Sequence, residues 1–334
     1  MVRFGITGFG LHAVKRLMPG FARAKKCSVI ALSRRNMVAA LESAAAYKIP
    51  HAFDSVAKLA ASPEVDAVLV TTPNSLHLAD VLAAIEGGKH VLCEKPMAMN
   101  AEECRQMVEA ARKRGVLLGV AHVFRFNHSV LRFREMVAEG EIGRPIFARS
   151  EFSFLANPEH PRKWLYDSAV AGAGPIFDIG VHCIDALRFI LNDEVVRVSA
   201  SAQSDERSGD VESAATLTLK FSKGAIGTVL VSYRADYRTP LEIIGEAGVL
   251  SADNALNVEH PIEILLRRGE KTETGTVSNQ SVYAQQVDAF SEAIEGKSRF
   301  PIPGEEGWQN QEILDAAMRS LRSNKTEAVP LVGR

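Results

Sequence analysis

The chain has few cysteines and no excess of charge of either sign. Its 334 residues include four cysteines, and these form neither a C-x-x-C pair nor the spacing of a disulfide framework. We therefore expect reduced thiols and a cytosolic protein. The formal net charge is -1 and no long basic run occurs, which argues against nucleic acid or an anionic membrane as the main partner. The composition favours a small-molecule ligand.

Signals for targeting, membrane insertion and metal binding are also lacking. The first apolar stretch runs directly into a glycine turn, and no apolar run is long enough to span a bilayer. No internal repeat or low-complexity linker is visible. His182 and Cys183 are adjacent and would point to different faces of a helix, and no second pair has zinc-ligand spacing, so we predict no metal. The length predicts about two domains.

A glycine turn near the start of the chain is typical of dinucleotide binding. Residues 2–7 predict a buried parallel strand, and Gly8-Phe9-Gly10-Leu11-His12-Ala13 follows as G-x-G-x-x-A before a helical pattern over residues 14–22. Gly8 permits the tight turn, and Gly10 lets the backbone approach a pyrophosphate that faces the helix N-terminus. His12 is interpreted as the variable residue of this motif. The alternative is a purely structural turn, but its place between a strand and a helix favours dinucleotide binding.

The second predicted strand, residues 28–32, ends without the acidic residue that usually binds the ribose hydroxyls of NAD. Ser33, Arg34 and Arg35 follow it, 25 residues or slightly more after Gly8. A hydroxyl and two guanidinium groups suit the 2′-phosphate of NADP, because arginine donates paired charge-assisted hydrogen bonds to phosphate. In the alternative, Arg34 and Arg35 are ordinary surface cations. We predict that NADP(H) is preferred and that NAD(H) is possible.

A charged tripeptide, Glu94-Lys95-Pro96, directly follows a short apolar strand over residues 90–93. In open parallel sheets, ligands bind beyond the carboxyl ends of the strands. Lys95 is therefore expected where a bound nicotinamide and its substrate would meet. An ammonium group at that position could polarise a carbonyl or stabilise a developing alkoxide, so the tripeptide predicts hydride transfer.

The order of helix and strand patterns predicts two kinds of domain. Up to about residue 121 the two alternate, which predicts a doubly wound parallel sheet. Within this part, Asn100 and Glu103 resemble a capping box before a helix over residues 101–114. Beyond residue 144, β-rich segments with glycine turns predict an antiparallel meander. The meander is interrupted by one predicted helix, and two further helices, over residues 282–295 and 308–323, are expected to close the chain.

The interrupting helix, predicted over residues 176–191, carries a second set of candidate residues. Asp178 and His182 are four residues apart and would share one helix face. Histidine suits proton exchange near neutral pH, and Asp178 could orient it or bind a substrate hydroxyl. The spacing alone supports an ion pair on the helix surface at least equally well.

Taken together, these motifs resemble the Gfo/Idh/MocA oxidoreductases, the group of glucose-fructose oxidoreductase and inositol 2-dehydrogenase, over nearly the whole chain. The matching segments are Gly8 to Ala13, Thr72-Pro73-Asn74 with His77, Glu94-Lys95-Pro96, and Asp178-Ile179-Gly180-Val181-His182. The resemblance implies that Lys95, Asp178 and His182 form the catalytic group. It also implies that Glu94 and the loop from Thr72 to His77 help to hold the cofactor.

For the fold, the resemblance implies an α/β Rossmann domain and an α+β domain with a large, mainly antiparallel open sheet. We place the first at residues 1–122 and the second at residues 123–334, with the C-terminal helix packing back on the first domain. The outer face of such a sheet commonly makes homodimers or homotetramers. Two departures stand out: Gly174-Pro175 replaces a glycine run, and His128 follows Arg125-Phe126-Asn127 where the family has proline.

The complete predicted site contains cofactor-binding and substrate-binding residues. The cofactor-binding residues are Gly8, Phe9, Gly10, Leu11, Ser33, Arg34, Arg35, Thr72, Pro73, Asn74, His77, Glu94 and Lys95. The substrate-binding residues are Lys95, Arg125, Asn127, Lys163, Trp164, Asp178 and His182, with His160 as a further candidate. Trp164 is equally plausible as a packing anchor.

The predicted reaction moves hydride between nicotinamide C4 and a hydroxyl or carbonyl carbon of a sugar, cyclitol or related polyol. In it His182 exchanges the proton and Lys95 stabilises the oxygen charge. Two alternatives stay open. A non-catalytic cofactor-binding sensor or assembly subunit is opposed by the intact Lys95, Asp178 and His182. A glycoside hydrolase that uses tightly held NAD for transient oxidation is opposed by the turn at Ser33.

Overall fold

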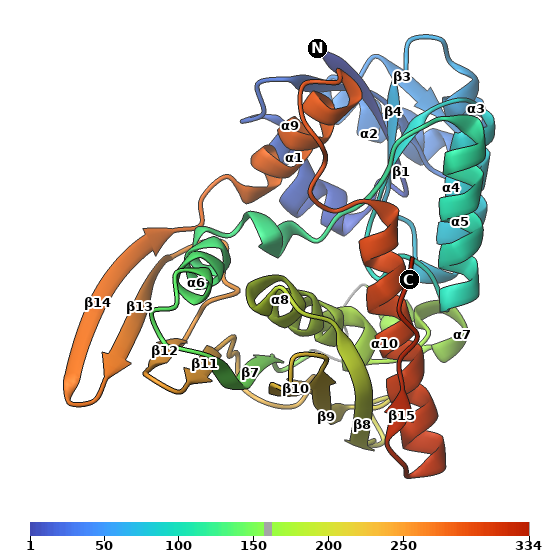
Figure 1. Cartoon of the computed structure of the whole chain (residues 1–334). Coiled ribbons are helices and arrows are strands. Elements are labelled where there is room, and N and C mark those ends of the chain that lie inside the picture. Colours follow the sequence, from blue (N-terminus) through green and yellow to red (C-terminus); the bar gives the residue numbers. More distant parts are fainter. Residues whose placement is uncertain (157–161, 334) are drawn as a thin grey trace. The chain divides into compact units, whose positions relative to one another are not determined.

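In the computed structural model, which describes residues 1–156 and 162–333, the contacts within the chain define two units (Figure 1). The first unit comprises Met1–His122 and Ser281–Trp308, and the second comprises Val123–Gln280 and Gln309–Arg334. This partition differs from the sequence-based division at residue 122 in one respect. Residues 281–308, assigned by the sequence to the second domain, belong to the first unit.

The first unit contains a six-stranded sheet in the order β3-β2-β1-β4-β5-β6, and every neighbouring pair is parallel. This is the doubly wound order, which reverses between β1 and β4. The predicted Rossmann fold is therefore confirmed, and the loops after β1, β4 and β5 leave the same edge of the sheet. The strands are β1 (Val2–Thr7), β2 (Cys27–Ser33), β3 (His51–Phe53), β4 (Ala67–Val70), β5 (His90–Cys93) and β6 (Leu118–Val120).

Helix α5 of the first unit begins at the capping residue that the sequence indicates. Asn100 accepts a hydrogen bond from the backbone N–H of Glu103 at 2.9 Å, and Glu103 accepts one from the backbone N–H of Met99, one residue before the cap, in a variant of the predicted capping box. The backbone N–H groups of Lys25 and Lys26 donate to Asp288 on the returning helix α9. The helical segments are η1 (Ala13–Leu17), α1 (Met18–Phe21), α2 (Met37–Tyr47), α3 (Val56–Ala61), η2 (Asn74–Leu76), α4 (His77–Glu86), α5 (Ala101–Arg114) and α9 (Val282–Ile294).

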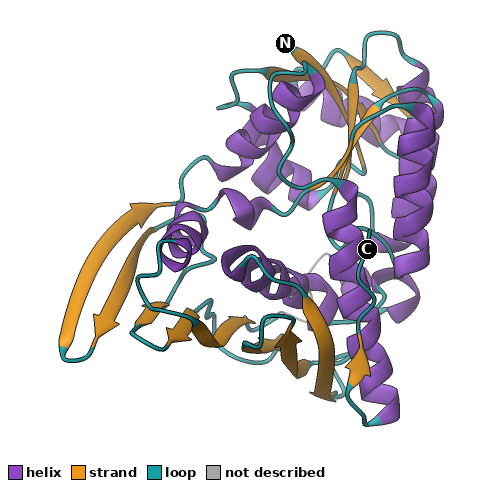
Figure 2. Cartoon of the chain, in the orientation of Figure 1, coloured by secondary structure: helices purple, strands orange, loops and turns teal. Residues whose placement is uncertain are grey.

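The second unit contains a nine-stranded sheet in the order β14-β13-β12-β11-β7-β10-β9-β8-β15 (Figure 2). Only β7 and β10 pair in parallel, so the sheet is mainly antiparallel, as predicted. The strands are β7 (Pro145–Ser153), β8 (Val195–Gln203), β9 (Ala214–Phe221), β10 (Ile226–Ser232), β11 (Leu241–Gly245), β12 (Val249–Ala252), β13 (Pro261–Arg268), β14 (Lys271–Ser278) and β15 (Glu327–Ala328).

Helix α8 packs against the central strands β7 and β10 of this sheet. The last helix, α10, begins at Gly304, four residues before its predicted start. Glu305 and Glu306 lie in its first turn, where carboxylates stabilise a helix N-terminus. The helical segments of the second unit are η3 (Val123–Phe126), α6 (His128–Ala138), η4 (Lys163–Tyr166), α7 (Ser168–Ala171), η5 (Ile176–Gly180), α8 (Val181–Leu191) and, from Gln309 onward, α10 (Gly304–Ser323).

One stretch differs from the expectation that no segment is long and apolar enough to cross a bilayer. By length and composition alone, Ser168–Leu191 meets that criterion, with a mean hydropathy of 1.3 in its most apolar window. The window is 83% buried inside the protein, as in the core helix of a folded domain. The stretch contains η5 and α8, so its hydrophobicity is that of a helix packed on a sheet.

Candidate functional site

The fingerprint loop after β1 has the geometry of a phosphate-binding turn. Gly8 has a φ of +75°, and a Cβ there would lie 2.6 Å from the backbone nitrogen of Thr72, so only glycine allows this approach of two loops. At Gly10 the nearest heavy atom to a Cβ, among the described residues, would be the carbonyl oxygen of Gly8 at 3.5 Å. The protein thus leaves space beside Gly10, which fits a cofactor pyrophosphate.

Phe9 lies between these two glycines, and Leu11 directly follows the second. The Phe9 side chain is 2% exposed and packs edge-on against Tyr47, with ring centroids 5.4 Å apart. Only the backbone of Phe9 can therefore contribute to a cofactor site. Leu11 is half-buried and opens the helical segment, in which Val14 donates to the Gly10 carbonyl at 3.0 Å.

His12 links the fingerprint loop to the tripeptide after β5. Its Nε2 lies 2.9 Å from Oε1 of Glu94, and its ring is edge-on to Tyr283. Burial opposes ionisation of Glu94, but His12 and Lys95 outweigh it and lower the pKa of the Glu94 carboxyl. In the fingerprint motif His12 occupies the variable position, and no motif indicates a partner 82 residues away.

His77 joins the loop after β4 to the loop after β5. Its Nδ1 lies 3.0 Å from the Pro96 carbonyl oxygen, and its Nε2 lies 2.8 Å from that of Thr72. Burial lowers the pKa of this imidazole, and the side chain is 1% exposed. A neutral ring carries one N–H and carbonyl groups only accept, so it donates to one loop at a time. Asn74 is buried and Pro73 half-buried in the same loop.

The end of β2 carries the residues predicted to choose between NAD and NADP. Ser33 is buried and its hydroxyl donates to Oγ1 of Thr7 at 2.9 Å. Nη1 of Arg34 donates to the hydroxyl of Ser43 at 2.8 Å, which holds the guanidinium beside α2. Arg35 is exposed. The end of β2 is therefore followed by two guanidinium groups, one held beside α2 (Arg34) and one exposed (Arg35).

Asp178 lies on the π-helical turn η5, and His182 follows on the first turn of α8. Single π-turns of this kind are frequent at functional sites. His182 is 8% exposed, and its ring centroid lies 4.4 Å from that of Phe124 and 6.3 Å from that of Phe152. The imidazole is thus a buried group with aromatic neighbours.

The entry into this helix is held by Glu212, which the sequence analysis did not single out. Its carboxylate accepts hydrogen bonds from the backbone N–H groups of Gly174 at 3.0 Å and Ile176 at 2.9 Å. Burial raises the pKa of Glu212, and these two bonds oppose that rise. A Cβ at Gly174 would lie 2.3 Å from the Glu212 carbonyl oxygen. Gly174-Pro175, which stands here in place of the family's glycine run, therefore lies where the backbone of Glu212 approaches closely.

Tyr233, just after β10, donates its phenol hydrogen to Oδ2 of Asp178 at 3.0 Å. Its side chain is 1% exposed, and burial together with Asp178 raises the pKa of the phenol well above its usual range. No sequence signal indicates this role, because an aromatic residue at a strand end is ordinarily a packing residue.

The two predicted residues of the Arg125-Phe126-Asn127 motif hold parts of the second unit in place. Arg125 makes a bidentate ion pair with Asp185, at 2.9 and 2.7 Å, and both side chains are buried. Asn127 donates to the carbonyl oxygens of Ala255 and Asn257. Substrate contacts by Arg125 and Asn127 stay predictions.

Two of the remaining candidates, Lys163 and Trp164, lie on η4. Lys163 is exposed and Trp164 is half-buried, whereas His160 lies outside the described residues. Lys95 belongs to the first unit, and Asp178 and His182 belong to the second. Within residues 1–156 and 162–333, no group of three or more His, Cys, Asp or Glu side chains could hold a metal ion.

Comparisons with known proteins agree with this geometry. Residues 2–122 match the oxidoreductase family model with an NAD-binding Rossmann fold, and residues 130–251 match the GFO/IDH/MocA C-terminal domain. The 1,5-anhydro-D-fructose reductase of Ensifer adhaerens is 36% identical over 92% of each chain. The D-xylose 1-dehydrogenase (NADP(+)) 2 of Haloferax volcanii is 30% identical over 96% of this chain and 97% of its own length.

Among solved structures, the aldose-aldose oxidoreductase of Caulobacter crescentus, complexed with glycerol, superposes with a TM-score of 0.91. It is 26% identical, and the match covers 98% of this chain and 99% of that one. Two matched domain models, relatives at 30% identity or more over nearly the full length, and the shared fold lead to one conclusion: the chain belongs to the Gfo/Idh/MocA family of NAD(P)-binding oxidoreductases.

Proposed function

We propose that the chain is an NADP(H)-dependent oxidoreductase of a sugar, cyclitol or related polyol. The observation that carries the proposal is Lys95 in the loop that directly follows β5, two residues after the strand ends and at the same sheet edge as the Gly8 to Ala13 loop. The relatives named above act on 1,5-anhydro-D-fructose and on D-xylose, and both compounds carry hydroxyl groups and ring C–H faces. Phe124 and Phe152 beside His182 offer apolar surface for such C–H groups.

In the proposed mechanism, three side chains act on the reacting oxygen. The bound nicotinamide supplies hydride acceptance or donation at C4. His182 takes the proton of the substrate hydroxyl during oxidation and returns it during reduction. Lys95 stabilises the negative charge that develops on that oxygen. Asp178 orients the imidazole or a substrate hydroxyl, so that His182 meets the reacting hydroxyl in one geometry.

The test of this function is turnover of free cofactor. NADPH oxidation with 1,5-anhydro-D-fructose and NADP⁺ reduction with D-xylose should be followed at 340 nm, together with a panel of cyclitols and hexoses. Turnover with any of them supports the oxidoreductase. Binding of NADPH without turnover on the whole panel would favour the sensor, and release of a glycosidic leaving group with catalytic NAD would favour the hydrolase.

We expect NADP(H) to bind about 10- to 100-fold more tightly than NAD(H), because each charge-assisted bond to the 2′-phosphate contributes about 1.5–3 kcal/mol. Arg34→Ala should remove most of this preference. Dissociation constants for both cofactors come from fluorescence titration. Arg35→Ala, which changes the neighbouring exposed cation, is the matched variant, and a preference lost there instead would assign the phosphate to Arg35. Equal constants in the unmutated protein would contradict the 2′-phosphate interpretation.

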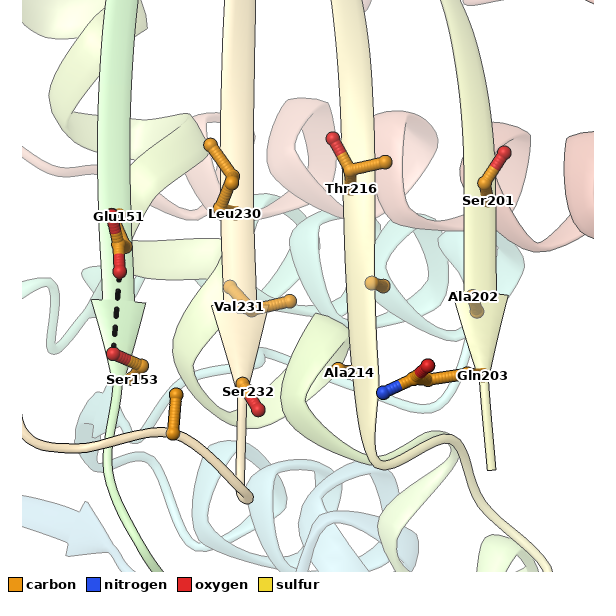
Figure 3. Close-up of a pocket in the computed structure, with 12 residues that line it drawn as sticks. Glu151, Ser153, Ser201, Ala202, Gln203, Ala214, Thr216, Leu230, Val231 and Ser232 are labelled. Atoms are coloured by element: carbon orange, nitrogen blue, oxygen red, sulfur yellow. Dashed lines mark hydrogen bonds between the residues drawn. The ribbon is translucent and has the colours of Figure 1, made fainter. Parts of the chain in front are cut away.

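We further propose that the chain forms a homodimer or homotetramer through the outer face of the nine-stranded sheet, defined as the face bearing Phe147 and Ile226. These two residues pair across β7 and β10, and they are 49% and 42% exposed. Further along the same two strands, from Glu151 on β7 and Leu230 on β10, lies a hollow of about 430 Å³ (Figure 3). Adjacent strands contribute the uppermost row of side chains in Figure 3, Glu151, Leu230, Thr216 and Ser201.

Ile226→Lys should convert the oligomer to a smaller species, because a charge would replace apolar surface at the centre of the proposed interface. Light scattering after size-exclusion chromatography measures the mass. Leu41→Lys on α2, which places a lysine at an exposed leucine of the first unit, should leave the mass unchanged. A monomeric unmutated protein at micromolar concentration would contradict the proposal.

A further inference from the structure

We propose that Tyr233 is a positioning residue for catalysis: its hydroxyl fixes the Asp178 carboxylate in the orientation that the reaction needs. The inference rests on the proposed function for Asp178 and adds a residue to it. The two residues are 55 positions apart, on the end of β10 and on η5, and their 3.0 Å hydrogen bond joins the sheet to the helix that carries His182.

Tyr233 is itself held rigidly, which a positioning role requires. Its backbone N–H donates to the Ser213 carbonyl and its carbonyl accepts from Ala156, both at 2.9 Å. Its ring packs against Phe154 and Tyr166, with centroids 5.2 and 6.1 Å apart. The side chain is fully enclosed. The position of the hydroxyl is therefore set by the sheet and its aromatic neighbours, independently of Asp178.

The charges around the phenol keep the hydroxyl a donor. Burial, then Asp178, and also Glu212 raise the pKa of Tyr233, whereas Arg162 acts in the opposite direction. The phenol thus holds its proton throughout the range in which an enzyme works. A phenol that keeps its proton can donate to an ionised carboxylate, and the bond favours the ionised form of that carboxylate.

The helix side of the contact is equally restrained. Glu212 accepts from the backbone N–H groups of Gly174 and Ile176, which fixes the start of η5 two residues before Asp178. With the backbone of η5 held by Glu212 and Oδ2 held by Tyr233, the carboxylate of Asp178 is restrained from both ends. Such restraint keeps a carboxylate aligned with the imidazole or hydroxyl it serves, and misalignment by a small distance lowers a rate strongly.

Tyr233→Phe tests the proposal, because it removes the hydroxyl and keeps the ring. We expect kcat to fall about 10-fold with a smaller change in KM. Two ionisations lie on the acidic side of the pH–rate profile, that of His182 and, at lower pH, that of Asp178. The acidic limb used in these tests is the lower one, that of Asp178, and it should move up by about one pH unit. The limb moves up because the ionised carboxylate loses a donor that favoured it. A purely structural tyrosine would leave the limb in place. Tyr166→Phe, which removes the hydroxyl of the adjacent ring, should also leave the limb in place.

A double-mutant comparison separates positioning of Asp178 from any other effect. In an Asp178→Asn background, Tyr233→Phe should cause little further loss, since the two residues act as one unit. Equal losses in both backgrounds would overturn the proposal. If Tyr233→Phe fails to fold, 3-fluorotyrosine at position 233 provides the second test: the more acidic phenol should move the acidic limb to lower pH, and an unmoved limb would overturn the proposal.

A measurement without substrate distinguishes failure of this inference from failure of the proposed function. The ¹³C carboxyl signal of Asp178, identified by its loss in Asp178→Asn, should titrate at higher pH in Tyr233→Phe than in the unmutated protein. An unchanged midpoint overturns the positioning role whatever the activity. A moved midpoint in a protein that turns over no substrate of the panel supports the contact and refutes the oxidoreductase.

Discussion

His182→Asn is expected to lower kcat about 10²- to 10⁴-fold on a confirmed substrate, the range typical for loss of an acid/base group. Asparagine retains a polar side chain but cannot take the hydroxyl proton. His182 is buried against Phe124 and follows the turn that carries Asp178. The loss should appear in kcat, because the proton moves only in the chemical step.

The pH–rate profile of the residual activity makes this test specific. If His182 carries the proton, the variant should lose the ionisation near neutrality that the unmutated enzyme shows. His260→Asn, at an exposed position of the same unit, is the matched control and should retain both rate and profile. Full activity with an unchanged profile in His182→Asn would assign the proton to Lys95 or water, and His182 to substrate binding.

The parts of the molecule that local sequence rules govern were predictable. The six-stranded parallel sheet follows from alternating strand and helix patterns, and the helix after Asn100 begins where a capping box predicts it. Gly8 is required by its positive φ and by the backbone of Thr72, which agrees with the tight turn expected from the fingerprint. For the capped helix and the glycine turn, the residues that determine the structure lie close together in the sequence. For the sheet, the alternation of strands and helices determines the fold of the domain.

The missed features depend on contacts between distant segments. His12 meets Glu94 across 82 positions, and Tyr233 meets Asp178 across 55. Arg125 makes a buried ion pair with Asp185 that the motif did not indicate, and its substrate contact stays a prediction. No period, cap or turn signal encodes such pairs. A single sequence therefore predicts which helices and strands form. It does not predict which side chain is held in place by which other side chain.

Lys95→Met is expected to lower kcat about 10²- to 10³-fold, the size of loss seen when one donor to a developing oxyanion is removed. Methionine keeps an unbranched chain of similar length and lacks the charge. Cofactor binding should change little, because the turn at Gly8 and the hydrogen bond between His12 and Glu94 are formed by other side chains and by the backbone. Single-turnover kinetics and cofactor titration on the same preparation measure the two effects separately.

Lys58→Met, at an exposed lysine of α3, controls for loss of one positive charge from the first unit and should leave both measurements unchanged. Lys95→Arg adds a sharper comparison: it restores the charge, but a planar guanidinium places its donors differently from a compact ammonium, so recovery should be partial. Loss of cofactor affinity equal to the loss of rate would move Lys95 from the chemical step to cofactor binding. A rate that falls while affinity holds would instead mean that the ammonium acts in the transition state, which a cofactor-binding sensor has no reason to stabilise.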